Sequence, residues 1–403
     1  MSKNFTETNR FLRNGITIVI ALVLFAVKLT TQDTIRFTWS AEWYSGKTFL
    51  QQPCKRIILQ ATNGKEFTVS WGDGTIKTII SDNDNSYLRA TILNHTYEKT
   101  GEYSVIITTS DPDCKFTYFD CSGNQLTSLD LTGCLALTRL RCDGNQLTSL
   151  NLTGCLALTE LDCRRNQLKN LDLTSCSALT ELDCENNKLA SLDLTAYSTL
   201  IRLDCNNNQL ANLDVSGYST LTVLYCANNQ LKNLNLTGCS TLTTLDCRNN
   251  QLTSLDLTAC SALQSLKCQN NQLQLSDLFA LHLLIDDENY KTLGEQNLPL
   301  QTVIVGKELF VEQSVFNGIF TSYDISKDKY YDDEEYYDYE DYYNYDNYEP
   351  VPENDYTVID GKLKFNTVGK YKVTMANEAI VSIDIYPVEV IVEIIVKKYI
   401  KDE

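Results

Sequence analysis

Leucines in the middle of the chain follow a fixed alternation of apolar and polar positions. Leu140 and Cys142 open one unit, and Leu161 and Cys163 open the next, so the pattern recurs every 21 residues. Successive side chains of a strand point to opposite faces, which turns Leu140 and Cys142 inward and leaves Arg141 outward. The pattern therefore predicts one short, half-buried strand in every unit.

Eight such units run from about residue 116 to about residue 283, and each reads LxxLxCxxNxLxxLDLTxCxx. No single unit can bury its own leucines, but stacked units share a continuous core, as in solenoid proteins. The second half of the unit repeats the spacing of the first, as in Leu147, Leu150 and Leu152. We therefore expect a solenoid with short parallel strands on both sides of every turn.

The unit is similar to the nested 21-residue leucine-rich repeats of bacterial surface and secreted proteins, written LxxLxCxxNxLxxLDLxx. The resemblance covers about 168 of the 403 residues, which is eight units of 21. It weakens at the ends, where Phe116 and Phe119 replace leucines and the last unit shifts after Leu273. It implies a mostly β, leucine-rich-repeat fold and a place outside the cell.

Cysteines fill one inward column and most of a second. Because Tyr197 and Tyr218 replace cysteine in the second column, we interpret both columns as chosen for burial. Fifteen cysteines in an exported chain could also form disulfides, between adjacent turns or between Cys54 and Cys114. In-register strands rarely give the dihedral angle that a disulfide needs, so we favour free, buried thiols. The first column contains Cys142, Cys163, Cys184, Cys205, Cys226 and Cys247, with Cys121 and Cys268 at its ends.

Asparagine forms a third inward column. An asparagine at the end of a strand can hydrogen-bond the backbone groups of its turn and of the next turn. A structural ladder explains this column without any functional role. Its members are Asn145, Asn166, Asn187, Asn208, Asn229 and Asn250, with Asn124 and Asn271 at its ends.

Residues 33–115 have the alternation of an antiparallel β-sandwich. A Trp71-Gly-Asp-Gly turn predicts a hairpin, and a His95-Thr-Tyr and a Gly101-x-Tyr-x-Val motif follow. The order of these motifs resembles the PKD type of immunoglobulin-like domain, which implies a role in spacing or adhesion. Asp73 is more typical of a structural turn residue than of a calcium ligand. We expect this domain to cover the open end of the solenoid.

Different patterns mark the two ends of the chain. Residues 1–32 carry three basic residues before an apolar run of about a dozen residues, which predicts a signal peptide or an uncleaved N-terminal anchor. We expect residues 284–298 to form a cap or linker, and Ser276 to cap a short helix before it. Residues 299–403 predict an immunoglobulin-like β domain with an acidic, tyrosine-rich loop at 329–349.

Charge and motifs exclude several functions. The net charge of −18 disfavours nucleic acid as a partner. Charged residues and a proline interrupt the apolar C-terminal stretch, so beyond the N-terminal segment we expect no membrane span. His95 and His282, the only histidines, have no nucleophile or carboxylate at a catalytic spacing, and no metal-binding or phosphate-binding motif occurs. We expect no enzymatic activity, no cofactor and no bound metal.

Binding is the function that the repeats favour. The outward positions of the first half vary among units, whereas those of the second half are nearly uniform, as expected for a recognition face on a constant scaffold. We therefore expect a secreted or cell-surface monomer that binds a protein or glycan. A surface spacer without a ligand, and glycan binding through the PKD-like domain or the tyrosine-rich loop, remain open. The candidate ligand-binding residues are Arg139, Arg141, Glu160, Arg164, Glu181, Arg202, Tyr225, Arg248 and Lys267.

Overall fold

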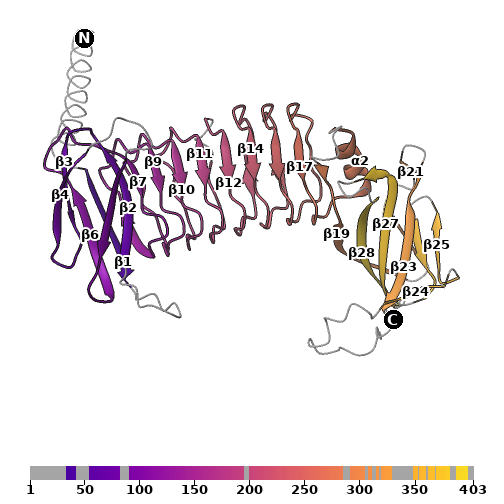
Figure 1. Ribbon diagram of the computed structural model, residues 1–403. Coiled ribbons are helices and arrows are strands. Elements are labelled where there is room, and N and C mark those ends of the chain that lie inside the picture. The colour runs from indigo at the N-terminus through magenta and orange to yellow at the C-terminus, as the bar shows by residue number, and fades with distance from the viewer. Residues whose placement is uncertain are drawn as a thin grey trace, which may run out of the picture. The chain divides into compact units, whose positions relative to one another are not determined.

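The computed structural model consists mostly of β-strands, with 3% of the residues in helices. It describes residues 33–41, 54–81, 90–194, 199–284, 291–304, 307–310, 315–316, 319–328, 348–352, 354–359, 362–367, 369–381 and 387–397. The predicted signal peptide at 1–32 therefore lies outside the described residues. The chain consists of two compact units, Met1–Leu179 and Thr180–Glu403. The expected fold class, a mostly β leucine-rich-repeat solenoid with flanking β domains, is confirmed (Figure 1).

Two sheets form the first unit, and aromatic side chains fill the space between them. The Trp39 ring stacks on Trp71 at 6.1 Å, and its indole nitrogen donates to the Tyr97 hydroxyl at 2.9 Å. One sheet has the order β4-β3-β6-β1-β8, with strands Ile76–Ile80, Glu66–Ser70, Gly101–Thr108, Thr34–Ala41 and Leu126–Asp130. The other has the order β10-β9-β7-β2-β5, with strands Glu160–Asp162, Arg139–Arg141, Phe116–Asp120, Cys54–Ala61 and Thr91–Thr96.

Both sheets of the sandwich continue into the first repeat. β2 pairs with β7, and β1 pairs with β8, so each sheet joins one side of the first turn (Figure 1). Phe119 packs against Phe37 at 5.9 Å, and Phe116 packs against Phe67 at 6.0 Å. These contacts bury the apolar end of the first turn, which is the covering role expected for this domain.

The repeat strands pair in parallel, each offset from the next by one unit. Leu140 faces Leu161 in the first unit, and Leu203 faces Leu224 in the second. All four leucines are buried, as the alternation predicted. The repeat strands of the second unit are β11 (Glu181–Asp183), β12 (Arg202–Asp204), β14 (Val223–Tyr225), β16 (Thr244–Asp246) and β17 (Ser265–Lys267).

Strands on the second half of the turns are fewer than expected. The structure has them only at β8, β13 (Leu213–Asp214) and β15 (Leu234–Asn235) among the described residues. In several turns, a single backbone hydrogen bond joins the second half of the turn to the preceding turn. One example is the bond from the Gln230 amide to the Leu210 carbonyl at 2.9 Å. One such bond per turn is too few for a continuous ladder, so the expectation of strands in every second half was wrong.

Within each unit, an asparagine ladder connects each turn to the preceding one. The side-chain oxygen of Asn229 accepts from the Leu210 amide at 3.0 Å, and its amide group donates to the carbonyls of Cys205 and Cys226 at 3.0 and 3.1 Å. Buried backbone groups cost free energy unless they are paired, and this one side chain pairs groups in two turns. The asparagine column therefore pairs backbone groups of successive turns.

Different groups terminate the ladder at its two ends. At the first turn, the buried Lys55 side chain donates to the Asn124 carbonyl at 2.7 Å, and the Arg56 amide donates to the Asn124 side chain at 3.3 Å. At the last turn, the Gln296 side chain accepts from the amides of Asn271 and Leu273 at 3.2 and 3.3 Å. Gln296 is fully buried and therefore serves as a further member of the ladder.

A helix and a short strand close the last turn. Helix α2 (Leu275–Leu284) follows the last repeat, and β18 (Lys291–Thr292) adds a parallel strand beside β17. Ser276 lies inside the helix rather than capping it, so that expectation was wrong. The Gln274 amide instead donates to the Asp277 carboxylate at 3.2 Å, because a carboxylate in the first turn can reach back to a free amide.

None of the described helices has the length and apolar character needed to cross a bilayer.

The C-terminal part of the second unit contains three smaller sheets, so β structure is present where the immunoglobulin-like domain was expected. The largest sheet has the order β19-β28-β27-β23-β24, with strands Gln296–Ile304, Pro387–Lys397, Gly369–Val381, Ser322–Asp328 and Tyr348–Pro350. The others are β20 (Glu308–Phe310), β26 (Lys362–Phe365) and β25 (Tyr356–Ile359), and the hairpin β21 (Val315–Phe316) and β22 (Ile319–Phe320).

Both cysteine columns consist of free, buried thiols wherever the structure describes them. Cys114 is also free, which argues against a bridge to Cys54. Tyr218 fills a cysteine position of the second column and is 5% exposed, so burial does explain the exchange of cysteine for tyrosine. Burial raises the pKa of Cys268 to about 12 and that of Cys176 to about 11, so almost none of either thiol is the reactive thiolate at neutral pH.

We expect these thiols to react with an aromatic disulfide reagent only after unfolding. In buffer at pH 8 the described cysteines should stay unreacted, because burial both excludes the reagent and suppresses the thiolate. In denaturant nearly all fifteen should react. A native-state titration that counted several fast thiols, or a denatured count near zero, would contradict the buried-thiol interpretation.

Candidate functional site

The candidate site is the outward side of the first-half strands, which we call the strand face. Each turn contributes the two outward residues at the end of its strand, which are the first and third residues of a three-residue strand, and the residue two positions later. In the turn of β9 these are Arg139, Arg141 and Asp143, and in the turn of β14 they are Val223, Tyr225 and Ala227. The two units are built in the same way, and each presents its own part of the strand face.

Aspartate at the third strand position has a structural role in most turns. In five turns its carboxylate accepts from the backbone amide two residues later, as from Ser122 to Asp120 at 3.0 Å. A local bond of this kind fixes the turn after the strand. The five aspartates are Asp120, Asp162, Asp183, Asp204 and Asp246. In the other three turns, Arg141, Tyr225 or Lys267 replaces this aspartate.

The uniform column of the second half has the same structural explanation. Asp130 accepts from the Thr132 amide at 2.9 Å, and Asn151 accepts from the Thr153 amide at 3.0 Å. The hydrogen bond lowers the pKa of Asp172, whose carboxylate accepts from Thr174. Uniformity there thus follows from turn chemistry. The contrast between the two halves therefore supports a recognition role less strongly than the sequence alone suggested. The turns of the strand face in which another residue replaces the aspartate are better evidence for such a role.

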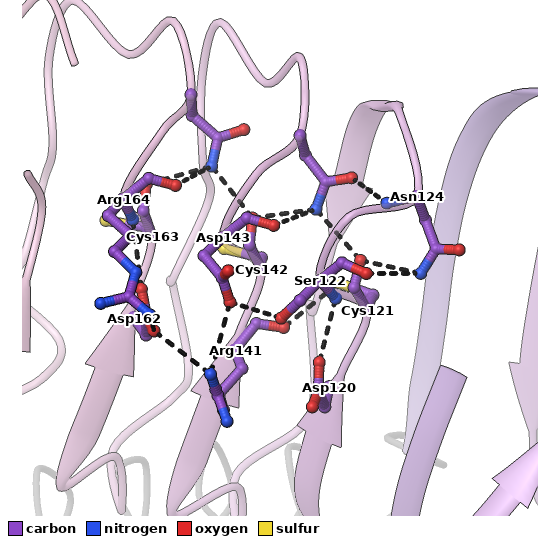
Figure 2. A network of polar contacts seen from close by, with 12 residues as sticks. Asp120, Cys121, Ser122, Asn124, Arg141, Cys142, Asp143, Asp162, Cys163 and Arg164 are labelled. Carbon is purple, nitrogen blue, oxygen red and sulfur yellow. Dashed lines mark hydrogen bonds and ion pairs between the residues drawn. The ribbon is translucent and has the colours of Figure 1, made fainter. Parts of the chain in front are cut away.

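In the first unit, Arg141 lies within a network of carboxylates (Figure 2). Its guanidinium is 3.8 Å from the Asp143 carboxylate and 3.7 Å from that of Asp162. Burial alone would lower the pKa of Arg141, but the charges of Asp120, Asp143 and Asp162 raise it. The Arg141 side chain is nonetheless 47% exposed, so it faces both the network and solvent.

The other predicted arginines of this unit are also paired. Arg139 contacts Glu160 on the next strand at 2.8 Å. Arg164 lies 3.6 Å from Asp162, and both are labelled in Figure 2. Because these pairs are partly exposed, each adds little stability. They do place a carboxylate beside each arginine, which offsets part of its charge. The structure thus brings Arg139, Arg141, Glu160 and Arg164 together on one surface, but as an ion-pair network.

In the second unit, Arg202 stacks on an aromatic ring. Its guanidinium carbon is 4.9 Å from the centre of the Tyr225 ring, and a nitrogen lies 3.7 Å from the Asp204 carboxylate. Asp204 itself is buried, and burial raises its pKa to about 6. The Ala227 amide, which an aspartate at position 225 would bond, is held by the Asn206 side chain at 2.6 Å. The neighbouring turn therefore compensates for the missing aspartate.

Arg248 has a similar arrangement on the other side of Tyr225. Its Nε lies 3.3 Å from the buried Asp246 carboxylate, but without hydrogen-bond geometry. Burial also raises the pKa of Asp246. Lys267 and Glu181 are exposed at the two ends of this part of the strand face. Arg202 and Tyr225 thus lie on the adjacent strands β12 and β14, and Arg248 lies two residues after the end of β16, the next strand. Glu181 and Lys267 lie further out, on β11 and β17.

Sequence reasoning missed a column directly before the ladder asparagines. Its residues adopt a left-handed backbone, from Gly123 and Gly144 through Arg165 to Asn270. Asn270 donates to Asn249, and Asn249 donates to Asn228, both at 2.6 Å. The recurrent Asn-Asn pairs in the sequence were the available signal, because asparagine tolerates the left-handed region better than most residues.

No group of three or more histidine, cysteine or acidic side chains is arranged to hold a metal among the described residues. Asp73, the possible calcium ligand, instead bonds the Thr75 amide at 2.9 Å and the His95 ring at 2.7 Å. That arrangement fits the turn role that the sequence favoured.

Comparison with known proteins gives similarity to leucine-rich repeats. The family described as leucine-rich repeats (two copies) matches residues 240–280. Among solved structures, the functional domain of InlJ from Listeria monocytogenes, described as including a cysteine ladder, is 22% identical with a TM-score of 0.37. The match covers 67% of this chain and 64% of that domain, less than two thirds of its length.

Other solved structures are similar at lower identity. The Listeria monocytogenes internalin-like protein lmo2027 is 14% identical, with a TM-score of 0.35, and the match covers 67% of this chain and 90% of that one. A leucine-rich-repeat protein of Leptospira interrogans is 20% identical, with a TM-score of 0.28, over 44% of this chain and 59% of that one. No curated protein matches the chain.

Proposed function

We propose that the protein is a non-enzymatic binding protein, secreted or held at the cell surface, whose strand face recognises a protein or glycan. One observation carries the proposal. Arg141, Tyr225 and Lys267 stand where the other turns of the repeats use a turn-bonding aspartate. Each gives up a local hydrogen bond in favour of a larger side chain, and arginine and tyrosine are the residue types that dominate binding hot spots.

The rest of the candidate set supports this role to different degrees. Arg202 and Arg248 flank Tyr225 and are 39% and 40% exposed, so both remain accessible to a partner. Arg139, Glu160 and Arg164 belong to the ion-pair network of the first unit and would supply complementary charge around Arg141. Glu181 and Lys267 would act at the rim of the second unit, where charges contribute more to the association rate than to affinity.

The ion pairs of the first unit favour a second candidate function there. Arg139 bridges to Glu160 and Arg141 bridges to Asp162, each from one turn to the next, so these side chains already have partners within the repeats. A surface spacer needs only such contacts within the repeats and no ligand. On this alternative, the first unit with its PKD-like domain at 33–115 would serve as a stalk, and only the second unit would bind.

Replacing Tyr225 and Lys267 by asparagine tests the proposal without disturbing the fold. Asparagine can make the turn bond at position 267, as Asn151 does in its own turn, and the Ala227 amide near position 225 already bonds Asn206. Tyr225→Asn with Lys267→Asn should therefore fold with a melting temperature close to that of the wild type. Binding to a partner identified on protein and glycan arrays should fall roughly 30-fold or more, as for the loss of a hot-spot residue. Arg141→Asn, measured separately, reports whether the first unit takes part.

A matched control changes the same number of exposed residues on the opposite side. Asn233→Ala with Ser254→Ala alters the second half of two turns and should leave binding intact. Equal binding by the wild type and the Tyr225/Lys267 variant would remove the strand face of the second unit from the proposal. A full-length chain that bound nothing on either array would support the spacer.

A further inference from the structure

The turn of β14 presents an apolar surface in a face that is otherwise polar. Its three outward positions hold Val223, Tyr225 and Ala227, whereas each other turn of the second unit carries at least one charged residue in these positions. Val223 and Tyr225 are partly exposed, and Ala227 is buried beneath its neighbours. We call these residues, with Arg202 and Arg248 beside them, the β14 patch.

The charge that the β14 patch shows to solvent is positive. Arg202 and Arg248 are 39% and 40% exposed, while the side chains of their partners Asp204 and Asp246 are only 10% and 8% exposed. Each pair is neutral as a whole, but its guanidinium lies outside and its carboxylate inside. An incoming group therefore meets guanidinium N–H donors first, on a chain whose net charge is −18.

These features together define the ligand. Guanidinium groups bind carboxylates with charge-assisted hydrogen bonds, and they stack on aromatic rings. The apolar surface between the two arginines, formed by Tyr225 and Val223, suits a flat ring. A peptide in which aromatic and acidic residues alternate closely would match both.

The chain itself contains such a peptide. Residues 330–349 hold nine tyrosines, nine acidic residues and two asparagines, and no lysine or arginine. Most of this segment lies outside the described residues. It joins β23 to β24, whose ends pair at Asp328 and Tyr348 in the same unit as the β14 patch. The segment and the chain as a whole are acidic, whereas the patch offers opposite charge.

We propose that the acidic, tyrosine-rich segment 330–349 binds the β14 patch, with carboxylates on Arg202 and Arg248 and a tyrosine ring over Tyr225 and Val223. The inference rests on the proposed function only in taking the strand face as a binding surface. It adds that the chain supplies a ligand of its own, which an outside partner must displace. Salt weakens the contact, because the exposed charges are screened.

The test uses the full chain with residues 330–347 replaced by a Gly-Ser-Gly linker. A fluorescent synthetic peptide of residues 330–349 is titrated with this variant at low salt, and binding is followed by fluorescence anisotropy. The peptide should bind, and it should bind the unmodified chain more weakly, because the attached segment competes. A Tyr→Ser peptide and an Asp→Asn, Glu→Gln peptide should both lose binding.

Two sets of substitutions in the linker variant locate the contact. Arg202→Ala with Arg248→Ala should weaken peptide binding by about tenfold or more. Lys188→Ala with Lys232→Ala removes the same charge from exposed positions outside the strand face and should leave it unchanged. Circular dichroism spectra that match the parent show that both double variants are folded.

Two results would overturn the inference: no binding of the peptide to the linker variant, or equal weakening by the arginine and the lysine variants. Either would show that charge alone, or nothing, attracts the segment. The array experiment with Tyr225→Asn and Lys267→Asn is independent of this peptide. If an outside partner still bound wild type and lost the double variant, the proposed function would stand while this inference fell.

Discussion

Asn229→Leu is expected to lower the free energy of unfolding of the repeats by about 2–4 kcal/mol. Leucine has the same number and branching of side-chain heavy atoms as asparagine but no polar atom, so the buried Leu210 amide loses its acceptor and water cannot replace it. A buried donor left unpaired costs about 1–3 kcal/mol, and each hydrogen bond lost besides it about 1 kcal/mol. The carbonyls of Cys205 and Cys226 keep the neighbouring asparagines Asn208 and Asn250 as donors.

Asn233→Leu in the same turn is the control, because Asn233 is exposed and should change stability by no more than about 0.5 kcal/mol. Urea denaturation followed by circular dichroism measures both variants. Hydrogen exchange at the Leu210 amide gives a local readout, which should accelerate in the Asn229 variant alone. Similar stability of the two variants would show that the ladder contributes little.

Gly72→Ala is expected to destabilise the N-terminal sandwich by about 2–6 kcal/mol. Gly72 has a φ of +86°, and a Cβ there would lie 2.6 Å from the Ser104 carbonyl oxygen of β6. The left-handed conformation costs a side chain about 1–3 kcal/mol, and a backbone clash of this kind adds about 1–3 kcal/mol. The neighbouring Trp71 stacks on the His95 ring at 4.7 Å and would have to move with the turn.

Gly74→Ala separates the two causes. Gly74 has a similar φ of +94°, but a Cβ there would meet no atom within 4 Å. This variant should therefore show only the conformational part of the loss. Tryptophan fluorescence is the readout, because all three tryptophans of the chain, at 39, 43 and 71, belong to the sandwich sequence. Equal destabilisation by both substitutions would mean that β6 yields to the added methyl group.

The sequence was sufficient to predict the inward columns of the repeats. Leu140, Cys142 and Asn145 recur in register from unit to unit, and each recurrence is independent support for the same buried position. The 21-residue period could not predict ladder residues where the spacing changes. Gln296 lies 25 residues after Asn271, rather than 21, so no column pointed to it as a ladder residue.

The candidate site was less predictable, because outward residues are governed by contacts between turns. The variation of the strand face identified Arg139 and Arg141 as candidates. It did not predict that both form ion pairs with residues of the next strand. The burial of Asp204 beneath Arg202 could not be inferred either, since aspartate is usually exposed. Pairing of β1 and β2 with the first repeat joins segments far apart in the sequence, and local patterns carry no signal for it.

The two ends of the asparagine ladder make the repeats comparable to a polymer with fixed end groups. Lys55 and Gln296 terminate the hydrogen bonds, and neither requires a particular number of turns between them. A gene encoding this protein could lose or gain 21 codons at a time and still encode both termini unchanged. Each such step would alter the length by about 5 Å, so length can evolve separately from the chemistry of the ends.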